Sequence, residues 1–448
     1  MMSLKWNLVA LAVSVGSSQM ALAAAVESQS EASGFVEGSS LSLDLKNYYF
    51  NRDGKNGGGT QKDWTQGVLG NFTSGYTQGT VGVGVDAFGY WALRLDGGAG
   101  TSGTGNMPVR NDGSPEDEFG TAGAAIKLRV SKTELKFGDM QPTAPVFGAG
   151  GTRLIPQTAT GFQLLSSEID GLDLDAGHFT SGNGVTTTNG RHGLNASYAS
   201  YGDAGLIDAN AVNYVGGKYI VSDALNVSLY GSEFEDVWRQ YYGNANYTLP
   251  FSADQSLVLD FNIYRTTDEG KAEAGSINNT TWSAQAAYSF LAAHTVTVAF
   301  QKVHGDTPFD YVSFGDNGPG DTGDSVFLNN SVQYSDFNGP GEESWQVRYD
   351  LNLATYGVPG LSFMTRYVSG DNIDGTKMAE DSPYRGYGYG ADGKHHETDV
   401  EAKYVVQNGP IKDMSFRMRQ SFHRGNTDQA EGDNNELRLI VDYPISVF

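Results

Sequence analysis

Six basic residues occupy alternating positions in stretches near the two ends of the chain: Lys46, Arg52, Lys403, Arg417, Arg419 and Arg438. Arginine stays charged at all physiological pH values, and its guanidinium group binds a carboxylate through two parallel hydrogen bonds. A row of such side chains could guide a molecule that carries a carboxylate. The alternative is that these residues only form ion pairs with Asp44, Asp399 and Glu401, which lie in the same stretches.

The opposite charge is concentrated in one segment. Between Lys302 and Arg348 there are eight carboxylates and no Lys or Arg, namely Asp306, Asp310, Asp316, Asp321, Asp324, Asp336, Glu342 and Glu343. Such a block could receive a cation, or it could be a solvated surface loop, which is the usual setting of a charge run. For Asp316, Asp321 and Asp324 the glycine-rich context favours the solvated loop.

The sequence predicts neither a cofactor nor a metal ion. There is no cysteine, which excludes disulfides and thiolate metal sites. The segment from Asp316 to Asp324 lacks the order of acidic residues found in a calcium-binding loop. Adjacent histidines on a strand face opposite ways, so His395 and His396 are not expected to share a metal ion, and a solvated loop is predicted for them.

The stretches that carry these residues alternate with a period of two. Runs beginning at Leu41, Leu257, Trp345 and Met414 place apolar side chains on one face and polar or charged side chains on the other. Each run is about 9 to 11 residues long, which is the length of a tilted strand that crosses a bilayer. We therefore predict membrane-spanning strands with one face toward lipid and one toward water.

The connections between these strands are asymmetric. Tight turns are predicted at Ser131-Lys132, Ser222-Asp223 and Leu291 to Ala293, and long loops at Gly315 to Asp324 and Ser369 to Lys394. Short turns at one end and long loops at the other are typical of outer-membrane barrels. At about 22 to 26 residues per strand and connection, the chain would form roughly 16 to 20 strands around an aqueous lumen.

The composition agrees with an exported β protein. The chain has 448 residues, 59 glycines, 24 tyrosines, 22 phenylalanines and a formal charge of −23, which argues against a nucleic-acid partner. Residues 1–23 have the form of a secretory signal peptide that ends in Ala21-Leu22-Ala23. Residues 24–448 are predicted to form a single barrel domain whose last strand ends at Phe448.

Several long segments resemble the OprD family of outer-membrane porins. They are NYYFNRD from Asn47, GTVGVGVDAFG from Gly79, QPTAPVFGAGGTRLIPQTATGFQ from Gln141, SVQYSDFNGPGE from Ser331, and RLIVDYP near the end of the chain. The resemblance implies an 18-stranded all-β transmembrane barrel in the outer membrane of a Gram-negative bacterium, narrowed by loops that fold inward. It also implies passive diffusion of basic amino acids, small basic peptides and carbapenems through a monomer or a weak homotrimer. The expected partners are outer-membrane lipid, lipopolysaccharide and the barrel assembly machinery.

The resemblance also assigns residues to the transport pathway. A basic ladder would comprise Arg52, Arg153, Lys403, Arg417, Arg419 and Arg438. A constriction pocket would comprise Tyr198, Tyr311, Ser331 and Asp336. A zwitterion with a cationic side chain would place its carboxylate on the arginines and its cation on Asp336.

Two other functions are compatible with the same fold. A related porin could prefer aromatic or other small carboxylates, in which case fewer acidic residues are expected at the constriction. A serine-peptidase activity attributed to this type of porin would place its triad at His178, Asp236 and Ser325. No G-x-S-x-G motif surrounds Ser325, so the sequence predicts a channel and not an enzyme.

Overall fold

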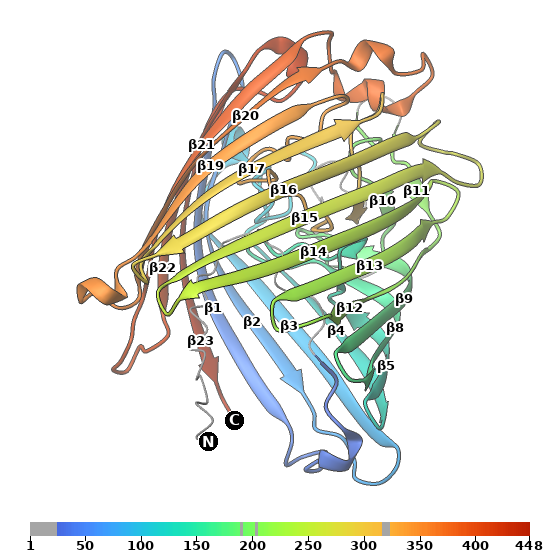
Figure 1. The fold of residues 1–448 in the computed structure, drawn as a ribbon, viewed down its shortest axis with the longest axis vertical. Coiled ribbons are helices and arrows are strands. Elements are labelled where there is room, and N and C mark those ends of the chain that lie inside the picture. The colour runs from blue at the N-terminus through green and yellow to red at the C-terminus, as the bar shows by residue number, and fades with distance from the viewer. Residues whose placement is uncertain (1–24, 189–190, 202–204, 316–322) are drawn as a thin grey trace.

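The protein is a closed β-barrel of 18 antiparallel strands in a computed structural model (Figure 1). The structure describes residues 25–188, 191–201, 205–315 and 323–448. Each wall strand pairs with its neighbours along the chain, and the last strand, β23, pairs with the first, β1, from Ser42–Ser446 to Gly54–Asn434. The barrel is therefore closed by its first and last strands. The predicted signal peptide lies outside the described residues, so it and the start of the barrel domain at residue 24 stay predictions.

The wall strands are named in chain order, and smaller strands in the loops share the numbering. The wall consists of β1 (Ser40–Gly54), β2 (Thr60–Thr73), β3 (Gly82–Asp96), β4 (Glu118–Val130), β5 (Thr133–Met140), β8 (Thr158–Ile169), β9 (Leu172–Asn183), β12 (Val212–Ile220), β13 (Leu225–Phe234), β14 (Trp238–Ser252), β15 (Gln255–Asp268), β16 (Asn278–Phe290), β17 (His294–His304), β19 (Glu343–Asn352), β20 (Leu361–Ile373), β21 (Gly393–Val405), β22 (Ser415–Gly425) and β23 (Asn434–Ser446). The four alternating runs predicted from the sequence lie on β1, β15, β19 and β22.

The strands expose apolar side chains and bury charged ones, the reverse of a soluble protein. On β22, Phe416 and Met418 are 43% and 40% exposed, whereas on neighbouring strands Arg438 and Asp399 are 3% and 1% exposed. The outward face therefore suits hydrocarbon and the inward face suits water, as the alternation predicts. No helix in the described residues is long and apolar enough to cross a membrane.

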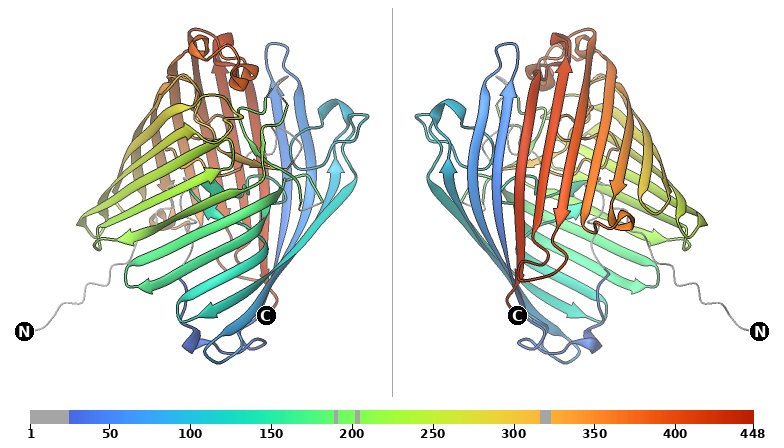
Figure 2. Two further views of the ribbon diagram at one scale, coloured as in Figure 1. Left: turned by 90° about the vertical axis from the view of Figure 1, so that its right-hand side faces the viewer. Right: turned by 90° about the vertical axis from the view of Figure 1, so that its left-hand side faces the viewer.

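The asymmetry of the connections is also confirmed, with one difference. The turns at 131–132, 221–224 and 291–293 are short and lie at one end of the barrel, where the C-terminus also lies (Figure 2). The predicted loop from Ser369 to Lys394 is shorter, because β20 continues to Ile373 and β21 begins at Gly393. Strands such as β1 are longer than predicted, because pairing extends beyond the part with strict alternation.

The long loops fold into the lumen and form its packed interior. Their short elements are β6 (Thr143–Ala144), β7 (Phe147–Gly148), β10 (Leu194–Ala196), β11 (Asp208–Ala209), β18 (Val312–Phe314), η2 (Ala99–Thr101), η5 (Gly375–Lys377), η6 (Pro383–Tyr387) and η7 (Thr427–Gln429). Two further short helices lie outside these loops: η1 (Gln29–Glu31) precedes β1, and η4 (Ala354–Tyr356) is in the short connection between β19 and β20. Phe147 and Phe314, from two different loops, stack with ring centroids 5.0 Å apart. Leu154 and Ile155 are fully buried in a second apolar cluster. These contacts fix the inward loops and thereby position the polar groups on them.

One inward segment crosses the lumen. At its start, the Phe327 amide donates a hydrogen bond to Tyr264 Oη on β15 (3.0 Å). Further along, the Gln333 carbonyl accepts a hydrogen bond from Arg438 on β23 (3.0 Å). In the pairing order of the barrel, β15 is far from β23, so residues 327–333 extend between distant parts of the wall. The segment narrows the channel, as the resemblance implies.

Candidate functional site

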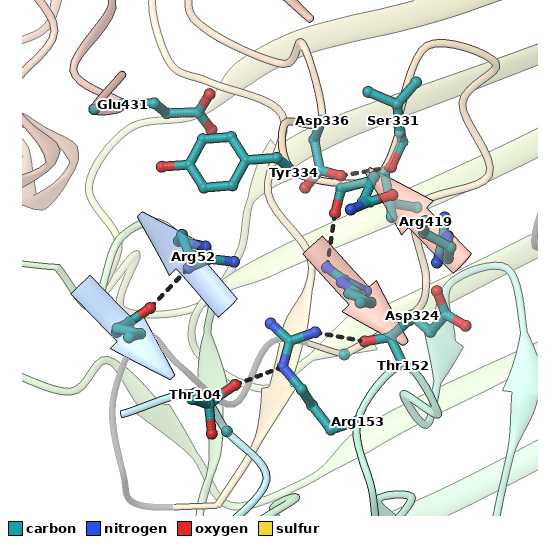
Figure 3. A pocket seen from close by; sticks show the side chains of 18 of the residues that line it. Arg52, Thr104, Thr152, Arg153, Asp324, Ser331, Tyr334, Asp336, Arg419 and Glu431 are labelled. Carbon is teal, nitrogen blue, oxygen red and sulfur yellow. Dashed lines mark hydrogen bonds between the residues drawn. The ribbon is translucent and has the colours of Figure 1, made fainter. Parts of the chain in front are cut away.

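A cavity of about 830 Å³ lies in the narrowed part of the lumen (Figure 3). Basic side chains from the wall and acidic or phenolic side chains from the loops line the same space. The predicted residues on it are Arg52, Arg153, Arg417, Arg419, Arg438, Tyr198, Tyr311, Ser331 and Asp336. The structure thus brings together every predicted ladder and constriction residue except Lys403.

The basic side begins with two arginines that share one glutamate. Arg52 Nη2 on β1 and Arg438 Nη2 on β23 each lie 2.6 Å from a different oxygen of Glu436. Arg52 and Glu436 face each other in the register of β1 and β23, and Arg438 is two residues further on the same face. Two guanidinium groups on one carboxylate leave one net positive charge.

The same two-to-one arrangement recurs on the neighbouring strands. Glu401 Oε2 on β21 lies 2.8 Å from Arg417 Nη2 and 3.2 Å from Arg419 Nε, both on β22. Of the three carboxylates predicted to pair with the basic residues, Glu401 does so, whereas Asp399 pairs with Arg366, and Arg52 and Arg438 pair with Glu436 instead. The arginines outnumber the carboxylates, however, so the wall keeps a net positive charge toward the cavity.

Arg153 adds a cation from a loop. Its Nε donates a hydrogen bond to the Thr104 carbonyl (2.9 Å), and the structure gives it no salt bridge to a carboxylate among the described residues. Its guanidinium carbon lies 5.4 Å from the centre of the Phe50 ring, which Arg438 also approaches at 5.6 Å. Burial and the neighbouring Arg438 lower the pKa of Arg153 to about 10, so it remains charged near neutral pH.

Lys403 lies apart from this cavity. It pairs in register with Arg417, and it shares the inward face of β21 with Glu401 and Asp399. It is closer than Glu401 to Val405, the end of β21 that leads into the connection at 406–414. Lys403 is therefore on the predicted face, next to Arg417, but it is not one of the residues that line the cavity.

The acidic side is centred on Asp336. Its Oδ2 accepts hydrogen bonds from Tyr198 Oη (3.0 Å) and Tyr311 Oη (2.8 Å), and its Oδ1 accepts one from Ser331 Oγ. Burial and the charge of Asp336 raise the pKa of both tyrosines well above the ordinary value, so both remain hydrogen-bond donors. Three hydroxyl groups orient the carboxylate, which is half-buried and still lines the cavity.

The rest of the acidic block has several different roles. Asp306 is exposed, and Glu342 is buried against His395. Asp310 accepts hydrogen bonds from the backbone amides of Tyr198, Ala199 and Tyr311, which hold the constriction residues in place. Asp316, Asp321 and most of the calcium-loop candidate lie outside the described residues.

Asp324 differs from the solvated loop predicted for it. Its side chain is half-buried and lines the cavity with Asp336. Burial and the nearby charge of Asp336 raise the pKa of Asp324 to about 7. The sequence prediction was wrong because the backbone amide of Asp324 donates a hydrogen bond to the Gly148 carbonyl (2.9 Å), which holds this residue beside the cavity.

Sequence reasoning missed several cavity residues. Arg366 on β20 forms an ion pair with Asp399 and lines the cavity, as do Tyr334 and Glu431 from the loops. Alternation around Arg366 is ambiguous, since both faces of that stretch carry apolar residues. No local pattern marks Tyr334 or Glu431, because their positions depend on the path of a loop.

The predicted triad residues have separate partners. His178 Nδ1, exposed on β9, is 2.7 Å from Asn213 Oδ1. Asp236, in the turn after β13, forms an ion pair with Lys271 (2.6 Å). Ser325 is fully buried, and its Oγ has no hydrogen-bond partner among the described residues. No described contact joins the three, and the serine-peptidase alternative is not supported.

Comparisons with known proteins identify the family. Residues 33–447 match the model of the outer membrane porins of the OprD family. The chain is 64% identical to Porin D of Pseudomonas aeruginosa over 99% of both chains. This chain belongs to the OprD family. It is a channel of the Gram-negative outer membrane and not an enzyme.

Solved structures of the family have the same fold. A crystal structure of Pseudomonas aeruginosa OprD matches with a TM-score of 0.81 at 58% identity, covering 94% of this chain and 99% of that one. A crystal structure of Pseudomonas aeruginosa OpdK with vanillate matches with a TM-score of 0.81 at 34% identity, covering 92% of this chain and 100% of that one. Family membership therefore leaves open whether the substrate is basic or an aromatic carboxylate.

Proposed function

We propose that this porin admits zwitterions with a cationic side chain, which are basic amino acids and small basic peptides, together with carbapenems. The observation that supports this proposal most directly is the position of Asp336 on the same cavity as Arg417 and Arg419. A substrate with a carboxylate at one end and a cation at the other has a partner for each end. The other predicted partners, which are lipopolysaccharide, the barrel assembly machinery and further copies in a weak trimer, remain part of the proposal.

The strength of the acidic site suits a channel. Two unit charges about 4 Å apart attract by about 1 kcal/mol in bulk water and by about 4 kcal/mol at an effective dielectric constant of 20. A term of that size can change relative permeation tenfold or more. Three hydroxyl groups already bond to Asp336, which leaves it fewer lone pairs for a substrate cation. Binding is therefore moderate, and the cation can be released.

A preference for aromatic carboxylates is the alternative. An anion that passes the cavity would meet the arginines favourably, but it would also pass close to Asp336 and Asp324. Close passage of like charges costs energy on the same scale as the attraction above. The carboxylates at the cavity therefore favour cationic side chains.

The experiment is competitive uptake into proteoliposomes with arginine and benzoate. We expect the wild type to pass arginine faster than benzoate, and Asp336→Asn to reduce this ratio about tenfold. Asp306→Asn is the matched control, because it removes the same charge from an exposed position in the connection that follows β17. If the wild type prefers benzoate, or if both variants retain the wild-type ratio, the proposed specificity is wrong.

A further inference from the structure

Three metal-binding side chains meet beside the cavity. His395 Nδ1 on β21 lies 2.9 Å from His423 Nε2 on β22, and Glu431 Oε2 lies 3.6 Å from the first and 3.4 Å from the second. His395 is not in a solvated loop, as the sequence suggested, but is 5% exposed on a strand. His396 does face the opposite way, so the second histidine comes from the neighbouring strand instead.

The outer nitrogen of each histidine is already held. His395 Nε2 is 2.7 Å from Glu342 Oε1, and His423 Nδ1 is 3.1 Å from the Gly432 carbonyl. Both partners are acceptors, so each of these nitrogens carries the proton. In the neutral form of both rings, the inner nitrogens, His395 Nδ1 and His423 Nε2, present lone pairs to each other. A carboxylate or carbonyl behind each imidazole is the usual arrangement around a metal-bound histidine.

The third group is an acceptor as well. Glu431 Oε2 is buried and accepts no hydrogen bond from the residues that the structure describes. When both imidazoles are neutral, three lone pairs converge on one point, and a positive charge placed there, as a proton on one ring or as a metal ion, stabilises the arrangement. Glu431 also lines the cavity, so an ion can reach this point from the aqueous lumen.

We propose that His395, His423 and Glu431 bind one divalent transition-metal ion of the Zn²⁺ class. Ligands about 2.0 to 2.1 Å from a tetrahedral Zn²⁺ are separated by about 3.4 Å, close to the two distances that Glu431 makes. The histidines would move apart by about 0.5 Å relative to their present 2.9 Å. Water from the cavity takes the fourth position. Two imidazoles disfavour Ca²⁺ and Mg²⁺, which prefer oxygen ligands.

The bound ion would join three segments of the barrel. Its ligands come from β21, β22 and the connection at 426–433, so it would hold that connection against the wall. It would also neutralise Glu431, an acidic group on the cavity. The proposed site does not depend on which organic substrate passes the channel.

The test is zinc binding by the folded barrel in detergent, prepared without a polyhistidine tag. After incubation with ZnCl₂ and desalting, elemental analysis should give about one zinc per chain, and calorimetry should give micromolar or tighter affinity. His423→Gln and Glu431→Gln should each weaken binding at least tenfold. His396→Gln is the matched control, because this exposed histidine neighbours His395 in sequence but faces away from the site.

A second readout keeps the proposal testable if a variant folds poorly. Co²⁺ added to the wild type should give the intense visible absorption of a tetrahedral site, and ZnCl₂ should remove it. Wild-type protein that retains no zinc, or that binds zinc no better than His423→Gln, would overturn the proposal. The cluster would then hold only a proton between its histidines.

Discussion

The basic wall and the acidic loops form one cavity by different means. The arginines project from paired strands, where register and alternation determine the face of each side chain. Asp336 and its hydroxyl partners are on inward loops, where only tertiary contacts determine position. On the wall, an excess of arginines over shared glutamates maintains the net charge. On the loops, three hydroxyl groups orient a single carboxylate. Different contacts therefore determine the net charge of the wall and the orientation of the Asp336 carboxylate.

The largest expected effect comes from breaking the face assignment of the wall. Met418→Arg would place a charge on the lipid face of β22, which costs about 2 to 4 kcal/mol near the middle of the membrane. Met364→Arg is the matched control. Met364 pairs in register with Glu401, so it shares the inward face, whereas Met418 pairs with Ala402, the next residue on that strand, which faces outward. Refolding into lipid vesicles, followed by urea titration, measures both. Equal losses for the two variants would contradict the assigned faces.

Removal of two wall arginines should have the next largest effect. Arg417→Ala combined with Arg419→Ala should lower the flux of substrates that carry a carboxylate about tenfold, while an uncharged sugar of similar size passes as before. The lost attraction between the arginines and the substrate carboxylate is electrostatic. The difference in flux between wild type and variant should therefore shrink above about 0.15 M salt, where the Debye length is about 8 Å. Liposome swelling with charged and neutral solutes measures this. A uniform loss would indicate collapse of the barrel.

The shared glutamate provides a test in the opposite direction. Glu401→Gln removes the one carboxylate between Arg417 and Arg419 and raises the net positive charge of the wall. We expect carboxylate-bearing substrates to bind several-fold more tightly, as measured by competitive block of single-channel current. Unchanged block would mean that the ratio of arginines to carboxylates does not set the charge of the wall.

The smallest effect should be a pH dependence on the acidic side. Since the pKa of Asp324 is raised to about 7, this carboxyl is mostly neutral at pH 6 and mostly charged at pH 8. Attraction of a cationic substrate should therefore rise with pH, giving about a two- to threefold increase in lysine flux between these values. Glu431 lines the same cavity and burial raises its pKa to about 7 as well, so Asp324→Asn should reduce the rise and Asp324→Asn combined with Glu431→Gln should abolish it. A wild-type flux that falls with pH would contradict this account.

The sequence predicted the wall better than the loops. Alternation placed Arg52, Arg417 and Arg438 on the inward face, because a strand of known register has only two faces. It could not show that Asp324 returns to the lumen or that His395 meets His423, since these positions depend on contacts between distant segments. The family resemblance, and not local pattern, supplied the constriction residues.

The central claim is that the two sides of the cavity recognise opposite ends of one substrate. Arginine, agmatine and citrulline test it directly, because agmatine lacks the carboxylate and citrulline lacks the side-chain charge. Uptake of all three should be measured in proteoliposomes containing wild type, Asp336→Asn, or Arg417→Ala with Arg419→Ala. We predict that Asp336→Asn removes the preference for arginine over citrulline and keeps the preference for arginine over agmatine. Arg417→Ala with Arg419→Ala should remove the preference for arginine over agmatine and keep the preference for arginine over citrulline. If either variant lowers both preferences equally, the two sides do not recognise separate ends.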